Sequence, residues 1–261
     1  MSCKEGIFML SRIKVVHFSP TGGTRRAALL LAEAMAADIE EIDLCGTETQ
    51  AYSFGADDVV LVAGPVYGGR LPALMVERLQ ADTGGGARVV SAVVYGGRAY
   101  EDALVELGDL LETQGFRVTA AAALLAEHSI VYLLAAGRPD AQDKAQLMEF
   151  GARIAAKLER GETAAPKAPG NRPYKEWAGM SAVPVVSEAC TACGACARQC
   201  PAQAIPQDDP RQTDAARCIT CMRCAAVCPQ QARALPAPVL QMLTQKLSPF
   251  VNKRQENELY L

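Results

Sequence analysis

The chain has no apolar run approaching the roughly 20 residues that a membrane-spanning helix requires. Its amino-terminal apolar run, residues 7–10, is too short for the core of a secretory signal peptide. The formal net charge of the 261 residues is only −3, which gives no bulk reason to expect binding to nucleic acid or to an anionic membrane. We therefore expect a cytoplasmic protein that neither spans a membrane nor binds nucleic acid.

Two common nucleotide-binding signatures are also missing. There is no G-x-x-x-x-G-K-[ST] motif, which disfavours a P-loop nucleoside triphosphatase. There is no G-x-G-x-x-G motif after the first predicted strand, residues 13–18, which disfavours a Rossmann dinucleotide site. We therefore expect that NAD(P)H neither donates electrons to the protein directly nor accepts them from it.

Cysteine, by contrast, is concentrated in one region. Eight of the ten cysteines lie in residues 190–201 and 218–229, and both runs read C-x2-C-x2-C-x3-C-P. This is the spacing of the bacterial [4Fe–4S] motif. A zinc site would require two well-separated cysteine pairs, and a disulfide framework would require an oxidising compartment. Cys3 and Cys45 stand apart, and we interpret them as ordinary free thiols.

The spacing also predicts which cysteines share a cluster. The first three cysteines of a run hold one cluster, and the fourth, just before proline, holds the other. The predicted ligands are, for cluster one, Cys190, Cys193, Cys196 and Cys228 and, for cluster two, Cys200, Cys218, Cys221 and Cys224. The 28-residue offset between the runs is an internal repeat, which predicts a pseudo-twofold module that resembles bacterial two-cluster ferredoxins. Residues 186–235 contain five arginines and four acidic residues. We therefore expect the reduction potentials of the clusters to lie on the less negative side for two-cluster ferredoxins.

Residues 13–160 alternate between short apolar runs and helical patterns. The predicted strands are 13–18, 39–44, 58–63, 88–95 and 116–125, and the predicted helices are 25–37, 72–80, 101–114 and 140–158. Such alternation indicates a parallel sheet covered by helices on both faces. The predicted fold is an α/β doubly wound parallel five-stranded sheet, followed by a small α+β module.

Three glycine-bearing loops follow the first, third and fourth predicted strands, where doubly wound sheets bind their ligands. The first holds Ser19, Pro20, Thr21, Gly22, Gly23 and Thr24; the second holds Pro65, Val66, Tyr67, Gly68 and Gly69; the third holds Tyr95, Gly96, Gly97, Arg98 and Tyr100. Hydroxyl groups and glycine N–H groups before a helix suit a phosphate monoester that is bound without lysine.

The first loop resembles the phosphate loop of flavodoxins, where a T/S-x-T-G-x-T turn holds the phosphate of flavin mononucleotide (FMN). The resemblance covers roughly residues 12–160 and implies that the second and third loops enclose the isoalloxazine ring. Tyr67 or Tyr100 would stack on this ring, the glycines would allow close backbone approach, and Arg98 is a candidate electrostatic contact. We interpret His17 as a core histidine and His128 as a surface loop residue.

The predicted organisation has four parts. Residues 1–160 form the FMN domain, 161–184 a proline-rich linker, 185–238 the two-cluster domain and 239–261 a carboxy-terminal helix and tail. We interpret the only tryptophan, Trp177 in the linker, as a packing anchor rather than a cofactor contact.

The whole chain resembles the flavodoxin–ferredoxin fusion proteins of anaerobic bacteria, which implies electron transport between two [4Fe–4S] clusters, FMN and external redox proteins. Two alternatives stay open. One is an FMN-dependent reductase of a small substrate that the clusters supply with electrons. The other is a redox sensor or assembly partner without turnover. The sequence contains no recognisable catalytic residues, and both an electron carrier and an enzyme are consistent with it.

Overall fold

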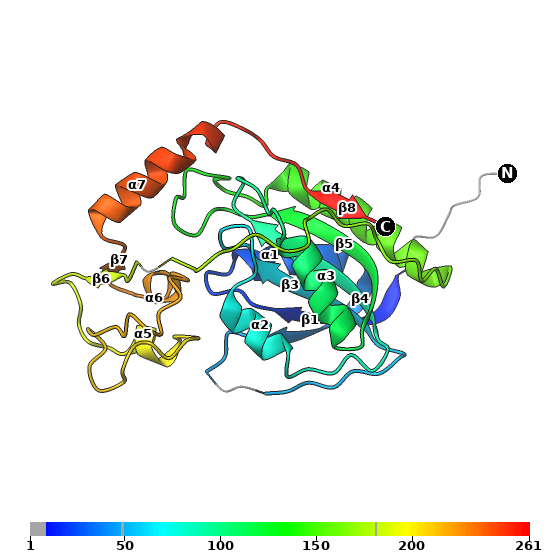
Figure 1. The fold of residues 1–261 in the computed structure, drawn as a ribbon, viewed down its shortest axis with the longest axis horizontal. Helices are drawn as coiled ribbons and strands as arrows, with labels where there is room; N and C mark the ends of the chain where they lie inside the picture. The colour runs from blue at the N-terminus through cyan, green and yellow to red at the C-terminus, as the bar shows by residue number, and fades with distance from the viewer. Residues whose placement is uncertain (1–8, 48–49, 181) are drawn as a thin grey trace.

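Five parallel strands form the centre of the larger part of the protein, as the computed structural model shows for residues 9–47, 50–180 and 182–261 (Figure 1). The strand order is β2-β1-β3-β4-β5, so the order in which successive strands are added reverses between β1 and β3. This is the order of flavodoxin-like sheets, so the predicted fold class is confirmed. The strands are β1 (Leu10–His17), β2 (Ala36–Asp43), β3 (Val59–Pro65), β4 (Arg88–Tyr95) and β5 (Arg117–Leu125).

Helices cover both faces of the sheet, because its strands are apolar on both sides. On one face, residues of α1 (Gly23–Glu33) and α4 (Ala141–Glu159) pack with buried side chains such as Ile13 and Leu61. On the other face, residues of α2 (Ala73–Leu79) and α3 (Ala103–Thr113) pack with buried side chains such as Val62 and Val93. These two apolar layers hold the carboxyl ends of β1, β3 and β4 at a single edge.

The first helix ends earlier than the sequence predicts. It stops at Glu33 instead of residue 37, and β2 begins at Ala36 instead of residue 39. Ala36 pairs with Leu10 of β1, whose N–H donates to the Met35 carbonyl at 2.8 Å. Strand pairing therefore overrides the strong helix propensity of the local alanines.

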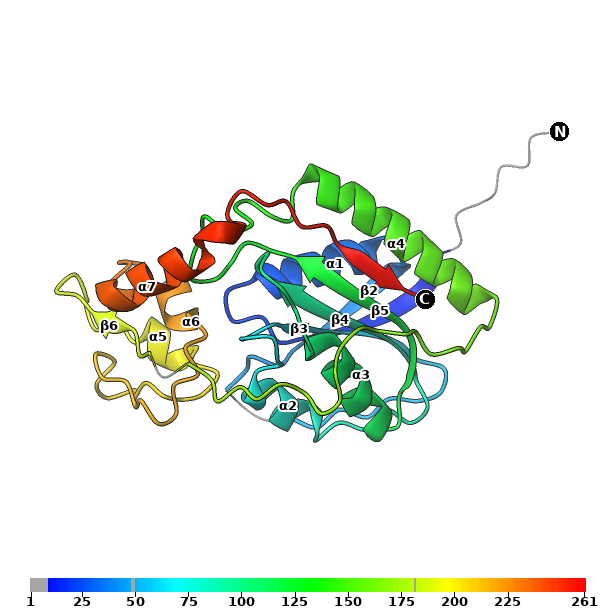
Figure 2. The same ribbon diagram turned by 45° about the horizontal axis from the view of Figure 1, so that its top comes forward.

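The sheet gains a sixth strand that the sequence did not reveal. After α7 (Ala237–Leu247) and a 3₁₀ turn (Ser248–Phe250), the tail returns to the sheet, where β8 (Glu258–Tyr260) pairs with β5 in antiparallel fashion (Figure 2). Asn257 fixes this return: its Oδ1 accepts from Leu125 N at 2.8 Å, and its Nδ2 donates to Asp143 Oδ1 at 2.9 Å. The chain is thus joined to the sheet again after the cysteine region.

The cysteine region folds as a separate small unit beside the sheet (Figure 1). It contains a two-stranded antiparallel pair, β6 (Val185–Val186) with β7 (Arg233–Ala234), and two short helices, α5 (Ala195–Arg198) and α6 (Arg223–Ala226). Positive φ angles recur at a 28-residue offset, at Ala192 and Thr220, Gly194 and Met222, and Gln203 and Gln231. The backbone therefore repeats as the cysteine spacing predicts. No helix in the described parts of the chain is both long and apolar enough to cross a membrane.

Candidate functional site

The first glycine loop forms a turn that opens α1. Ser19 is buried, and its Oγ accepts from Arg25 N at 2.9 Å, while its carbonyl accepts from Gly22 N at 3.3 Å. Gly22 precedes the helix with a φ of 89°, a left-handed conformation that favours glycine. These two hydrogen bonds of Ser19 hold the loop against the amino terminus of α1.

This loop retains the groups that an anion needs. Among the described residues, the N–H groups of Gly23 and Thr24 donate to no protein acceptor. They lie in the first turn of α1, where N–H groups have no intrahelical partner and the helix dipole is positive. The hydroxyl groups of Thr21 and Thr24 lie in the same loop. The donor set therefore fits a phosphate group.

The second loop is a tight turn between Tyr67 and Arg70. Tyr67 N donates to the Arg70 carbonyl at 2.9 Å, and Arg70 N donates to the Tyr67 carbonyl at 3.2 Å. Gly68 and Gly69 stand between them with φ angles of 60° and 89°. A two-residue turn of this hand requires positive φ at both central positions, which explains the glycine pair. Burial raises the pKa of the Tyr67 phenol well above its usual value, and the nearby Cys221 and Cys45 add to this shift.

The third loop is held by the tail. The Tyr100 ring packs edge-on against Tyr95, with their centroids 5.3 Å apart. Its hydroxyl lies 2.9 Å from both Glu258 Oε2 and the Tyr260 hydroxyl. Arg98 pairs with Glu101 at 2.8 Å. Tyr100 and Arg98 thus have protein partners, a fact that the sequence alone did not indicate.

Neither histidine is an exposed side chain. His17 is buried, and its Nε2 lies 3.2 Å from Glu41 Oε2, which agrees with a core histidine. His128 was expected on the surface, but it packs against the third loop: a Cβ on Gly96 would lie 2.7 Å from its Cβ and Cδ2. His128 Nδ1 accepts from Ile130 N at 3.1 Å and from Val131 N at 3.0 Å. The proton of the neutral ring therefore sits on Nε2.

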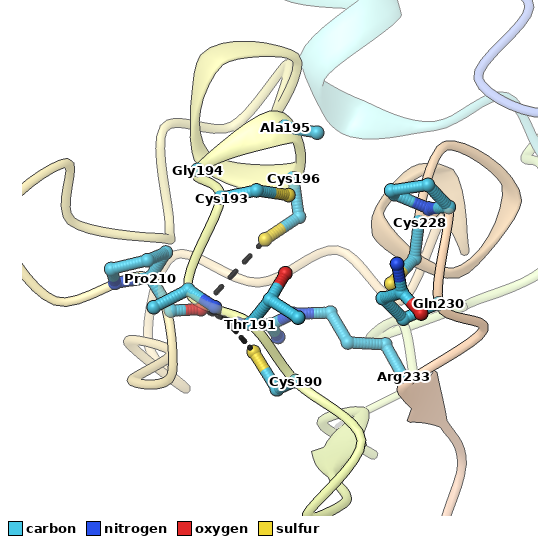
Figure 3. Close-up of a pocket in the computed structure, with 12 residues that line it drawn as sticks. Cys190, Thr191, Cys193, Gly194, Ala195, Cys196, Pro210, Cys228, Gln230 and Arg233 are labelled. Atoms are coloured by element: carbon cyan, nitrogen blue, oxygen red, sulfur yellow. Dashed lines mark hydrogen bonds between the residues drawn. The ribbon is translucent and has the colours of Figure 1, made fainter.

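The cysteines gather in two groups. Cys190, Cys193, Cys196 and Cys228 line one pocket, together with Pro210 and Arg233 (Figure 3). Cys193 is exposed, whereas Cys196 is buried. The grouping matches the four ligands predicted for cluster one, which remain a prediction. Among the described residues, no group of three or more His, Cys, Asp or Glu side chains is arranged to hold a single metal ion.

The other group is more deeply buried. Burial raises the pKa of the Cys221 thiol to about 12, and the neighbouring thiols of Cys200, Cys224 and Cys218 add to the shift. Burial likewise raises the pKa of Cys224 to about 11. The pKa of Cys218 is also raised by burial. Buried thiols with raised pKa values become thiolates only beside a compensating positive charge, which the iron of a cluster would supply. This donor set fits the ligands predicted for cluster two.

The buried cysteine group lies against the first loop. Arg223, next to Cys224 in the sequence, donates from Nη1 to the Pro20 carbonyl at 3.0 Å. Arg78 of α2 donates to the carbonyls of Leu44 and of Pro201, at 2.7 Å to the latter. The residue after Cys200 is therefore joined to the edge of the sheet as well.

Cys45 is the residue at this junction that sequence reasoning missed. Its Sγ accepts from Ser19 N at 3.1 Å, and it is buried. Burial raises its pKa to about 12, with the carboxylate of Asp43 adding to the shift and the nearby Cys221 contributing less. Its position after the second predicted strand, near the first loop, was the only available signal. Cys3 lies outside the described residues.

Comparisons with known proteins agree with this division. The protein-family model described as a 4Fe-4S dicluster domain matches residues 189–233. Among curated proteins the sequence has no significant match.

Solved structures resemble the larger part. A short-chain flavodoxin associated with a bacterial microcompartment is 18% identical, with a TM-score of 0.39, covering 57% of this chain and 99% of that chain. A flavodoxin of Streptococcus pneumoniae TIGR4 is 21% identical, with a TM-score of 0.39, covering 56% and 99%. Rubredoxin oxygen:oxidoreductase from the anaerobe Desulfovibrio gigas is 15% identical, with a TM-score of 0.37, covering 60% of this chain and only 38% of that one.

Because these TM-scores are low, the fold class rests on the strand order itself. The dicluster match rests on the cysteine region. The chain therefore joins a flavodoxin-like α/β domain to a 4Fe-4S dicluster domain, a combination that supports electron transfer in general.

Proposed function

We propose that the protein transfers electrons between external redox proteins and a bound FMN through two [4Fe–4S] clusters. In this proposal the first glycine loop holds the FMN phosphate, and the second and third loops enclose the ring. Cys190, Cys193, Cys196 and Cys228 hold cluster one, and Cys200, Cys218, Cys221 and Cys224 hold cluster two. The proposed domain limits are those predicted above: 1–160, 161–184, 185–238 and 239–261.

The observation that carries the proposal is the contact between Arg223 and Pro20. It brings a residue between two proposed cluster-two ligands, Cys221 and Cys224, to the proposed phosphate loop. Cluster two is accordingly the cluster that faces FMN. In this proposal cluster one lies toward external partners, which the exposure of Cys193 supports.

The protein supplies position and environment for this transfer. When bound, FMN accepts or donates one or two electrons, whereas each cluster exchanges one. Ser19 and Gly22 shape the phosphate loop, and the phenol of Tyr67 lies near Cys45 and Cys221. Cys221 and Cys45 are both buried, so they would keep water away from the junction between the two proposed cofactor sites.

Anaerobic purification followed by quantification of iron, sulfide and flavin tests the composition. We expect about eight iron atoms per chain, as two cubane clusters require, with one FMN. Reduction with a one-electron donor should bleach the cluster absorption and the flavin absorption in sequence. Protein that binds no FMN after gentle purification and reconstitution would contradict the proposal.

A second candidate function is reduction of a small substrate at the flavin. The position of His128 favours it, because a neutral imidazole with its proton on Nε2 packs against the third loop. Burial lowers the pKa of His128, and Arg98 lowers it further. This function would be supported if a small substrate oxidised the reduced protein with saturable kinetics and if the rate of this oxidation fell in His128→Ala. Unchanged oxidation kinetics in that variant would contradict it.

A further inference from the structure

The linker is attached to the larger domain instead of spanning free space. Asp102, at the start of α3, accepts with Oδ1 from the N–H of Asn171 at 2.8 Å and from its Nδ2 at 2.9 Å. Its other oxygen accepts from Lys175 N at 2.7 Å. These N–H groups lower the pKa of Asp102, that of Lys175 most strongly. Residues 171–177, which we call the strap, are thus fixed to a buried carboxylate.

Further contacts tie the strap to both predicted ring loops. Arg70, from the second loop, donates to the Lys175 carbonyl at 2.6 Å, and its guanidinium lies 4.9 Å from the Tyr174 ring centroid. Lys175 Nζ pairs with Glu101, which follows the third loop and also pairs with Arg98. The strap therefore bridges the two loops between which the flavin ring is proposed to bind.

These contacts determine where Trp177 lies. A Cβ on Gly68 would lie 2.4 Å from the indole Cδ2 and Cε2 atoms, so the indole packs directly on the backbone of the second loop. Gly68 is needed here for its positive φ and also for the absence of a Cβ. The Trp177 side chain nevertheless stays 42% exposed. The Trp177 indole is thus held against the second loop, and part of its aromatic surface stays accessible.

We propose that Trp177 forms one wall of the isoalloxazine site, an inference that rests on the proposed FMN site. A flavin ring requires a flat apolar surface, and aromatic side chains provide it by offset stacking. Tyr100 is engaged with Tyr95 and the tail, and the phenol of Tyr67 lies near Cys45 and Cys221. The linker therefore completes a site that the α/β domain alone leaves with few free aromatic surfaces.

Titration of FMN into flavin-free protein with intact clusters tests the inference, with flavin fluorescence and the visible flavin bands as readouts. Loss of an aromatic stack in Trp177→Ala should weaken FMN binding about tenfold and shift the bands. Trp177→Phe should retain most of the affinity. Tyr132→Ala removes another exposed aromatic side chain, 59% exposed and outside the strap, and should leave binding unchanged.

The outcomes separate this inference from the function on which it rests. Wild-type affinity and spectrum in Trp177→Ala would overturn the role of Trp177 while the FMN site stands. Equal loss of affinity in Trp177→Ala and Trp177→Phe, with unshifted flavin bands, would assign Trp177 to packing of the strap and would also overturn it. Failure of the wild-type protein to bind FMN would instead refute the proposed function.

Discussion

Arg223 Nη1 donates to the carbonyl oxygen of Pro20 at 3.0 Å, across 203 positions of sequence. Its Nη2 donates to Gln199 Oε1 at 2.9 Å, which orients the guanidinium. Gln203 reinforces the junction by donating to the Thr47 carbonyl at 2.8 Å. These contacts come from residues within three positions of proposed cluster-two ligands, so the junction defines which side of the dicluster domain faces the sheet.

Replacing Arg223 should loosen this junction. A hydrogen bond from a charged donor contributes about 1.5–3 kcal/mol, so Arg223→Ala should raise the undocked fraction about 10- to 150-fold. Cleavage of residues 177–184 by limited proteolysis should rise, and flavin reduction by the clusters should slow. Arg211→Ala is the control, because Arg211 donates to the carbonyl of Cys190, a proposed cluster-one ligand. Similar behaviour of both variants would contradict the assignment of cluster two to the junction.

Much of the α/β domain could be predicted because its signals are local. The runs 58–63 and 88–95 are apolar and β-branched: the first became β3 with small changes at its ends, and the second became β4 with the predicted bounds. The cysteine runs were equally informative, since their spacing recurs as a backbone repeat. No local sequence pattern predicts the strap or β8. Asp102 meets Lys175 73 positions away, and Glu258–Tyr260 becomes a strand only through the free edge of β5.

The left-handed residue Gly22 provides a direct test of the phosphate loop. A side chain in this conformation costs about 1–2 kcal/mol, so Gly22→Ala should reduce stability and distort the loop. Gly161 has a φ of 66° and, like Gly22, no atom within 4 Å of an added Cβ. Gly161→Ala should therefore lose similar stability. Only Gly22→Ala should weaken FMN binding, as measured by flavin fluorescence; equal affinities in both variants would contradict a phosphate site at this loop.

Acidification should weaken the attachment of the tail. Arg254 holds the pKa of Asp140 well below its usual value, with help from the N–H of Asp143. A carboxylate with a lowered native pKa contributes stability above its unfolded pKa, near 3.9, and loses it as the pH falls through the native pKa. The melting temperature should therefore depend less on pH, between about pH 5 and pH 3, in Asp140→Asn than in the wild type.

Asparagine still caps a helix, so Asp140→Asn removes the charge and keeps the α4 cap. Asp57→Asn, at an exposed position, is the control for removing one negative charge. Because Asp140 is partly exposed, added salt should reduce the difference between wild type and Asp140→Asn. Identical pH profiles for the wild type and Asp140→Asn would show that the Arg254 pair does not stabilise the fold.

Asn257 should be the main attachment point of the tail. Its amide uses both ends: Oδ1 accepts from Leu125 N, and Nδ2 donates to Asp143 and to Gln146. Asn257→Ala leaves buried polar groups unpaired, each at a cost of about 1–3 kcal/mol, so the free energy of unfolding should fall by about 2–4 kcal/mol. Hydrogen exchange at residues 258–260 and 121–123 should accelerate. Asn252→Ala changes an exposed asparagine in the same tail and should alter neither quantity. Since β8 residues also hold Tyr100, release of the tail should increase proteolysis near the third loop; protection there in Asn257→Ala would show that the loop keeps its position without the tail.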